Sequence, residues 1–201
     1  MDITTDTHAD THTYMNMNNT ALLVIDLQPI FTNNLQNDVK YEFEKNISTT
    51  LSYMRNMLPP ECIVHLRANY SNTPMKTRSY HLNPNLPVPD DITPTTYGIE
   101  HENEVVFEKS TINGFHDTPL DKYLKSKNII KIYCIGLLTA ACVHETAIGG
   151  LNRGYIPILI QDACIDKTVE RHQMVIDLYH DYLYEVISIE DLIKIIRYLY
   201  I

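Results

Sequence analysis

The sequence predicts an α/β fold, a three-layer sandwich in which helices cover both faces of a six-stranded parallel β-sheet. Two observations predict this fold. Short, continuously apolar runs, which are typical of strands buried on both faces, occur along the 201 residues. Segments with helical periodicity lie between these runs, and such alternation implies right-handed crossovers between parallel strands. We therefore expect a single parallel sheet whose edge carries the functional site.

Six segments have the pattern of buried strands. The first, ALLVID, is a short apolar run with no polar residue until its last position. The later segments are similarly rich in apolar and β-branched residues. The predicted strands cover residues 21–26, 62–66, 104–109, 131–137, 157–163 and 184–188.

Helical periodicity fills most of the intervals between these strands. Apolar residues recur at three- and four-residue spacing from Phe43 to Leu58, and Pro59 ends the pattern. Ser188 with Asp191 forms a capping signal at the start of the last helix. The predicted helices cover about residues 43–58, 118–127, 141–153, 169–183 and 189–200.

The sequence pattern predicts one domain over residues 20–201, with a tail before it. Residues 1–19 are polar and lack the basic and hydrophobic regions of a signal peptide, so we expect a disordered segment. Residues 68–103 contain five prolines and little helical periodicity. A loop of that length is usually functional or mobile.

The composition indicates which class of partner and which cellular compartment to expect. The formal net charge of −9 disfavours nucleic acid, whose phosphates repel an acidic surface. No apolar stretch approaches the length of a membrane-spanning helix. The four cysteines show no CxxC pairing and favour a reducing compartment. We therefore expect a cytoplasmic protein that acts on a small molecule.

Three reactive side chains fall where the predicted strands end. Ligands of parallel α/β sheets bind outside the carboxyl ends of the strands. Asp26 ends the first strand, Lys109 ends the third, and Cys142 follows the fourth at the start of a helix. A helix start and a nearby lysine favour a thiolate, and free N–H groups there could hold an oxyanion. Asp26 could accept the thiol proton.

Each of these residues also has an ordinary structural interpretation. A lone cysteine at a strand–helix junction is usually inert, and an aspartate that ends a strand usually caps a helix or forms a turn. A lone lysine at such a place is usually a solvated charge. All three at strand ends of one sheet favour a cysteine nucleophile over these separate interpretations.

Three longer motifs resemble the isochorismatase-like cysteine hydrolase superfamily, which includes nicotinamidases, isochorismatases, and N-carbamoylsarcosine and ureido amidohydrolases. They are LLVIDLQPIF (22–31), FEKSTINGF (107–115) and GLLTAACVHETAIGGLNRGY (136–155). The resemblance implies a parallel sheet of six strands, for which we expect the order 3-2-1-4-5-6. It also implies an Asp–Lys–Cys triad, which falls on Asp26, Lys109 and Cys142, and dimers or tetramers. A cis peptide is expected at Leu137–Leu138, with the oxyanion between the backbone N–H groups of Leu138 and Cys142.

Further residues are candidates for the pocket, and each has an alternative. Phe31 matches a pocket aromatic or packs in the core, and Phe115 lines the pocket or anchors packing. Gln28 orients the loop after Asp26 or is solvated. Several side chains near the long loop could clamp an anionic group of the substrate. They are Arg67, Tyr70, Lys76, Arg78, Tyr80 and His81.

Three other residues are interpreted as supporting the fold. The Thr139 hydroxyl is expected to stabilise the nucleophile loop or to form a simple turn. Asp162 resembles a structural position of the family. His144 lies two residues after Cys142, so the two side chains point to different faces of a helix, and we expect a structural role.

The chain also departs from relatives that it resembles. Nicotinamidases carry metal ligands after the second strand, but residues 65–74 contain no Asp and no regularly spaced His pair, so we expect no metal and no cofactor. Ala140 and Ala141 replace the usual polar residues before the nucleophile.

These patterns leave three functional hypotheses. The first is a cysteine hydrolase that cleaves a C–N bond of a small amide, ureide or carbamoyl compound through a thioester. The second is a vinyl-ether hydrolase of the isochorismatase type, in which Asp26 is the acid and Cys142 is a bystander. The third is a catalytically silent scaffold that binds a small molecule.

Overall fold

The computed structural model describes residues 17–33, 35–73 and 88–198. Within these residues, six strands form one sheet in the order β3-β2-β1-β4-β5-β6, and every pair of neighbours is parallel. The predicted architecture and strand order are confirmed. The strands are β1 (Thr20–Ile25), β2 (Ile63–Ala68), β3 (Val105–Lys109), β4 (Lys131–Leu137), β5 (Ile156–Ile165) and β6 (Glu185–Ile187).

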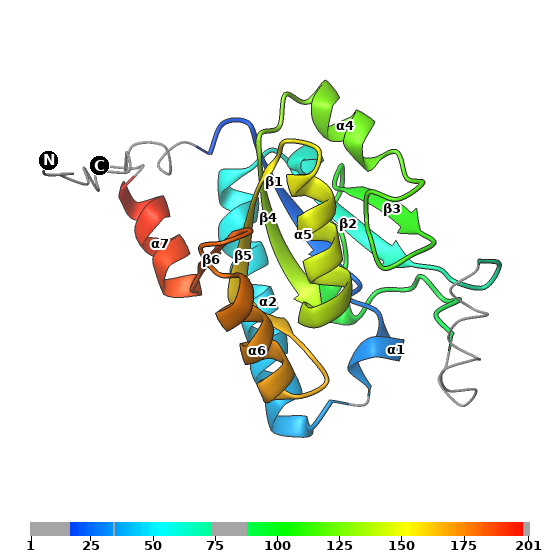
Figure 1. Ribbon diagram of the computed structural model, residues 1–201. Coiled ribbons are helices and arrows are strands. Elements are labelled where there is room, and N and C mark those ends of the chain that lie inside the picture. Colours follow the sequence, from blue (N-terminus) through cyan, green and yellow to red (C-terminus); the bar gives the residue numbers. More distant parts are fainter. Residues whose placement is uncertain (1–16, 34, 74–87, 199–201) are drawn as a thin grey trace, which may run out of the picture.

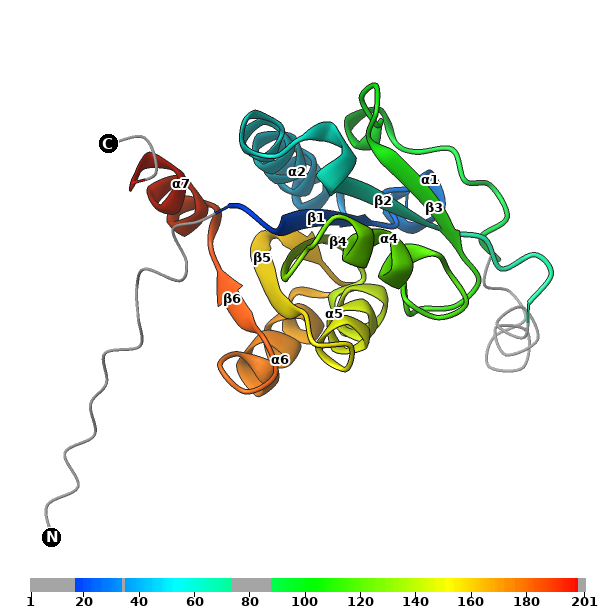
Figure 2. The same cartoon turned by 90° about the horizontal axis from the view of Figure 1, so that it is seen from above.

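Helices cover both faces of the sheet. Figure 2 shows α2 and α7 on one side of the strands, and α4, α5 and α6 on the other. Their bounds are α1 (Pro29–Thr32), α2 (Asn37–Met57), α4 (Leu120–Ser126), α5 (His144–Leu151), α6 (Val169–Tyr179) and α7 (Ile189–Tyr198). Two buried apolar clusters pack between the sheet and the helices. One includes Phe43, Ile47 and Leu51, and the other includes Leu120, Leu124 and Ala147.

Some predicted bounds differ from the observed ones. The helix expected from Phe43 begins at Asn37, six residues earlier, where polar residues hide its periodicity. The helix expected from residue 141 begins at His144, because residues 139–143 form a π-helical turn. The capping signal of α7 is confirmed, since Ser188 N donates to Asp191 and Asp191 N donates to Ser188 Oγ.

The order in which the chain adds strands to the sheet reverses between β1 and β4. From β1 the chain adds β2 and β3 on one side, and from β4 it adds β5 and β6 on the other. In Figure 1 both central strands run toward the lower edge, where α1 lies. The carboxyl ends of β1 and β4 therefore form the crevice in which parallel α/β sheets bind ligands.

Two predictions concern regions at the limits of the described chain. Most of the predicted tail, residues 1–16, lies outside the described residues, and Asn19 O accepts hydrogen bonds from the N–H groups of Ile130 and Lys131. Among the described helices, none is both long and apolar enough to cross a membrane.

Candidate active site

The loops after β1, β2, β3 and β4 converge at the carboxyl edge of the sheet. Asp26 follows β1 with a left-handed backbone (φ 56°), a conformation that non-glycine residues adopt mainly at turns and functional sites. Its N–H donates to Leu66 O at 2.9 Å, which ties this turn to β2. The backbone thereby holds the carboxylate at the switch between β1 and β4.

Asp26 and Lys109 form a completely buried ion pair. Lys109 Nζ lies 2.8 Å from Asp26 Oδ2, and both side chains are 0% exposed. The ammonium also donates to Tyr70 Oη at 3.3 Å and to Thr111 O at 3.1 Å. Burial lowers the pKa of Lys109, but the charge of Asp26 outweighs that effect and holds the pKa above its ordinary value. Lys109 therefore stays a cation.

The carboxylate of Asp26 has spare hydrogen-bonding capacity. Both of its oxygens are buried, and Oδ2 is paired with Lys109, but Oδ1 has no hydrogen-bond partner among the described residues. A buried acceptor without a partner is unusual in a folded protein. The Cys142 thiol is close enough for the charge of Asp26 to affect its pKa. Asp26 is thus placed to accept a proton from that thiol.

Cys142 is a buried thiol that faces this pair. It is 5% exposed, and its Sγ lies 3.8 Å from Tyr70 Oη. Burial and the charge of Asp26 raise its pKa to about 12, while Lys109 and Tyr70 lower it. Burial therefore favours the neutral thiol, in opposition to the effect expected from the helix start and from Lys109.

The loop that carries Cys142 is tightly held. The Leu137–Leu138 peptide is cis, as the family resemblance implied. Leu138 O accepts from the N–H groups of Ala141 and Val143 in the π-helical turn. Gly136 has φ 120°, and a Cβ there would lie 2.0 Å from Ile25 O. Glycine at this position lets β4 approach β1 next to the nucleophile loop.

A second layer of contacts fixes this loop from the side of α6. Ala140 N donates to Asp166 Oδ2 at 2.6 Å, and the other carboxylate oxygen accepts from Arg171 Nε at 2.8 Å. The Thr139 hydroxyl lies 2.8 Å from His172 Nδ1. The supporting role predicted for Thr139 is confirmed. Asp166 and His172 were missed, although Asp166 directly follows β5 and so obeys the strand-end rule that found Asp26.

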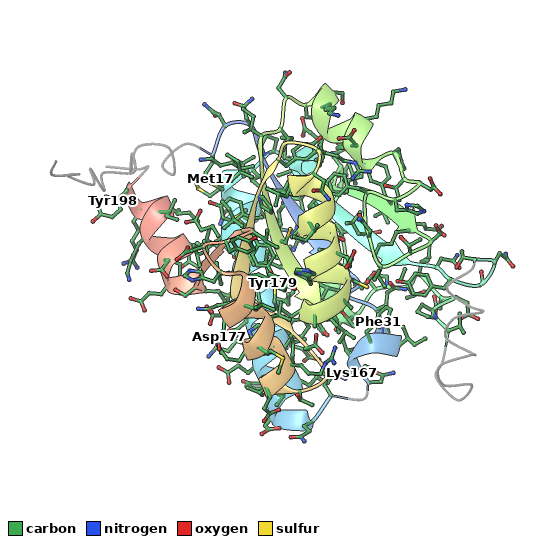
Figure 3. All side chains as sticks on the ribbon, viewed as in Figure 1. Met17, Phe31, Lys167, Asp177, Tyr179 and Tyr198 are labelled. Atoms are coloured by element: carbon green, nitrogen blue, oxygen red, sulfur yellow. The ribbon has the colours of Figure 1, made fainter. Side chains whose placement is uncertain are left out.

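The other pocket candidates differ in their contacts. Gln28 is buried and gives its amide to the backbone, donating to Ala68 O and Asp91 O and accepting from Ala68 N. It orients the loop after Asp26, which is one of its two predicted roles. Phe31 is partly buried against the apolar cluster that contains Phe43, and Figure 3 shows it on α1. Its role in the pocket stays a prediction.

Phe115 packs away from the nucleophile. Its ring stacks on Tyr155 with 5.6 Å between centroids, and a Cβ on Gly150 would lie 3.3 Å from it. Gly150 is near the carboxyl end of α5, whereas Cys142 precedes the amino end. These contacts favour the packing anchor over the pocket wall.

Two residues with expected structural roles have structural contacts. His144 stacks on Tyr179 with 4.4 Å between ring centroids, and its Nδ1 lies 3.1 Å from Tyr184 Oη. Asp162 accepts from Ile189 N at the start of α7 at 2.6 Å. Both expectations are confirmed.

Of the six residues expected to clamp an anionic group of the substrate, the structure describes two, Arg67 and Tyr70. Arg67 forms an ion pair with Glu100 and is buried, so its charge is already matched. Tyr70 contacts Lys109 and Cys142 instead. Lys76, Arg78, Tyr80 and His81 lie outside the described residues.

A small polar cavity of about 210 Å³ opens beside Lys109. Residues from the ends of β2 and β3 and from the loops after them line it. They are Asn69, Ser71, Asn72, Thr73, Glu108, Lys109, Ser110 and Asp117. Within the described chain, no group of three His, Cys, Asp or Glu residues is placed to hold a metal ion.

Comparisons with known proteins agree with this architecture. The uncharacterized isochorismatase family protein YddQ of Bacillus subtilis is 26% identical over 80% of this chain and 86% of its own length. The ureidoacrylate amidohydrolase RutB of Klebsiella pneumoniae is 34% identical over 74 residues, which are 37% of this chain and 29% of that protein.

A solved structure has the same fold. The cysteine hydrolase from Pseudomonas syringae pv. phaseolicola matches with a TM-score of 0.77 and 23% identity, covering 92% of this chain and 95% of that one. The isochorismatase domain family matches residues 20–191, which is most of the chain and contains Asp26, Lys109 and Cys142. The chain therefore belongs to the isochorismatase family of hydrolases.

Proposed function

We propose that the protein is a cysteine hydrolase that cleaves a C–N bond of a small amide, ureide or carbamoyl compound through a thioester. One observation carries the proposal. The buried Asp26 carboxylate is paired with Lys109 through Oδ2, has no hydrogen-bond partner at Oδ1, and lies beside the thiol of Cys142. Unused acceptor capacity next to a neutral thiol is what a general base needs.

In the first half of the reaction the enzyme is acylated. The Cys142 thiol gives its proton to Asp26 while Sγ forms a bond with the substrate carbonyl carbon. The electron pair of the C=O bond moves to oxygen, which becomes an oxyanion. When the carbonyl re-forms, the C–N bond breaks, and the nitrogen leaves as ammonia or an amine with the proton from Asp26.

Water completes the cycle. Asp26, again a carboxylate, takes a proton from a water molecule whose oxygen attacks the thioester carbon. The C–S bond then breaks, and the Cys142 sulfur recovers the proton from Asp26. The acyl group leaves as a carboxylic or carbamic acid. Lys109 stays charged throughout and stabilises the anionic form of Asp26.

The oxyanion is assigned to the backbone N–H groups of Leu138 and Cys142. Two donors aimed at a developing negative charge are the usual device for acyl transfer. The contacts of Ala140 with Asp166 and of Thr139 with His172 support this assignment, because they hold the same loop in place.

The substrate class rests on a partial match to a curated relative and on the presence of the thiol. The relative RutB is named a ureidoacrylate amidohydrolase, and its partial match favours ureides within the broader amide class. The presence of Cys142 disfavours the vinyl-ether alternative, since that chemistry needs an acid but no thiol.

The test measures ammonia release from a panel of small amides, ureides and carbamoyl compounds. Wild type is compared with Asp26→Asn, Lys109→Ala and Cys142→Ala. The proposal expects all three variants to lose turnover together on the same substrates. Retained activity in Cys142→Ala on a substrate that Asp26→Asn cannot process would favour the vinyl-ether hydrolase. Absence of any hydrolysis by wild type, on the panel and on isochorismate, would favour the silent scaffold.

Several finer points stay predictions. We expect no cofactor, a small-molecule substrate as the partner, and a cytoplasmic location. We also expect a homo-oligomer, a dimer or a tetramer, which light scattering on the purified chain would measure.

A further inference from the structure

We propose that Tyr70 is a further catalytic residue, whose hydroxyl donates a hydrogen bond to Cys142 Sγ while its oxygen accepts one from Lys109 Nζ. Through this link the charge of Lys109 stabilises the sulfur as it becomes a thiolate. The inference rests on the proposed function, because it assigns Tyr70 a part in the reaction of Cys142. Sequence patterns suggested instead that Tyr70 contacts the substrate.

Backbone and side-chain contacts hold Tyr70 next to Lys109 and Cys142. It follows β2, its N–H donates to Pro89 O at 2.6 Å, and its side chain is buried. Its Oη lies 3.3 Å from Lys109 Nζ and 3.8 Å from Cys142 Sγ. The ammonium also lies 5.5 Å from the centre of the ring. The phenol is thus between the cation and the nucleophile.

The donors and acceptors determine which way the hydrogen bonds point. A lysine ammonium has three hydrogens and no acceptor. Its three near partners are Asp26 Oδ2, Tyr70 Oη and Thr111 O, so Tyr70 receives a hydrogen bond from Lys109. The single phenol hydrogen is then free to point elsewhere, and Cys142 Sγ is within reach.

The same assignment explains how Lys109 influences the sulfur. All three hydrogens of the ammonium are matched by partners other than Cys142. Its effect on Sγ therefore passes through the phenol in addition to acting across space. A contact of 3.8 Å is long for a resting thiol, and such contacts shorten when the acceptor becomes charged.

The directions in which the pKa values of Tyr70 and Cys142 shift are consistent with this geometry. Burial raises the pKa of Tyr70 well above its ordinary value, so the phenol stays protonated and remains a donor. Burial also raises the pKa of Cys142, whereas the hydrogen bond from Tyr70 lowers it. Tyr70 thus partly offsets the desolvation that keeps the thiol protonated.

The experiment removes the hydroxyl and keeps the ring. Tyr70→Phe is treated with iodoacetamide between pH 6 and pH 11, and labelling of the Cys142 peptide is followed by mass spectrometry. A hydrogen bond to a charged group corresponds to a shift of about one to two pH units. Because the pKa of Cys142 is about 12, the whole pH range lies below the midpoint, where the labelling rate follows the thiolate fraction. We expect labelling of Tyr70→Phe to be about ten- to a hundredfold slower than that of wild type at each pH.

Tyr123→Phe is the matched control. It also removes one tyrosine hydrogen bond, the 2.7 Å contact to Glu61 O, but at a distance from Cys142. We expect its labelling profile to equal that of wild type. A Tyr70→Phe profile that coincides with the control would overturn the inference.

A second variant distinguishes the loss of the hydrogen bond from a change in the packing around Tyr70. Replacing Tyr70 by 3-fluorotyrosine keeps the ring and makes the hydroxyl a stronger donor, so labelling of Cys142 should be faster than in wild type at the same pH. Unchanged labelling rates in both variants would contradict the role of Tyr70. Failure of the proposed function would be seen separately, as turnover retained by Cys142→Ala, and would leave these labelling profiles unchanged.

Discussion

Two buried clusters of charge lie at the two ends of β3, one around Glu104 and one around Lys109, and they differ in how completely their acceptors are matched. In the first, Glu104 accepts from Arg55 Nε at 2.7 Å, from Arg55 Nη2 at 3.0 Å and from His101 N at 3.0 Å, and it lies 2.8 Å from His65 Nε2. In the second, Asp26 Oδ2 is paired with Lys109, and Oδ1 has no hydrogen-bond partner among the described residues.

The difference separates a structural cluster from a reactive one. Burying a carboxylate is costly unless its oxygens are paired, and Glu104 meets that requirement fully. Asp26 leaves acceptor capacity unused next to a thiol. Burial and charge alone therefore do not mark the site. The unmatched acceptor does, and the predictions below test that distinction.

The largest contrast concerns turnover. Asp26→Asn preserves shape but removes the base, so we expect the turnover number to fall by about 10²–10⁴-fold, the usual scale for a positioned acid–base group. Glu104→Gln should leave turnover within a fewfold of wild type. Both are measured as ammonia release per folded protein, with folding checked by circular dichroism. A loss as large in Glu104→Gln as in Asp26→Asn would break the comparison.

The opposite contrast concerns stability. Burial raises the pKa of Glu104, but hydrogen bonds from His65, Arg55 and His101 outweigh it and hold the pKa well below its ordinary value. This carboxylate therefore stabilises the fold above its ordinary pKa, and the contribution is lost as the pH falls toward the lowered value. Glu104→Gln should lower the free energy of unfolding at pH 7 by about 3–5 kcal/mol.

Urea unfolding at several pH values checks the sign. The stability of Glu104→Gln should approach that of wild type below pH 4, because wild type then loses what the variant already lacks. A difference between the two proteins that stays constant from pH 7 to pH 3 would show that the charge of Glu104 is not what matters.

A smaller effect is expected from the layer behind the nucleophile. Asp166→Asn weakens a charge-assisted hydrogen bond to Ala140 N, and we expect about a tenfold lower turnover number with little change in KM. Asp162→Asn is the control, because Asp162 accepts a bond of the same length from Ile189 N at the start of α7 and not from the nucleophile loop. Equal losses in the two variants would mean that the loop does not depend on Asp166.

No effect at all is expected from a chelator. His65 is already paired with Glu104, and the described residues hold no group of three ligands. We therefore expect EDTA to leave ammonia release unchanged. Activity that is lost with EDTA and restored by zinc, iron or manganese would point to a metal-dependent amidase.

The sequence predicted the parts of the fold and site that depend on local pattern. Continuous apolar runs located all the described strands within two residues, and the strand-end rule placed Asp26, Lys109 and Cys142 at one edge. The rest depends on contacts between distant segments. The thiol pKa follows from burial, and the position of Phe115 follows from stacking on Tyr155, neither of which sequence spacing shows.

Most directly, the central claim is tested by looking for the acyl group on the sulfur. Wild-type enzyme turning over an active amide or ureide is quenched in acid within milliseconds, digested and analysed by mass spectrometry, in parallel with Cys142→Ala. The account predicts a transient acyl mass on the Cys142 peptide and no turnover by the variant. Turnover by Cys142→Ala at the wild-type rate, with no added mass on wild type, would contradict it.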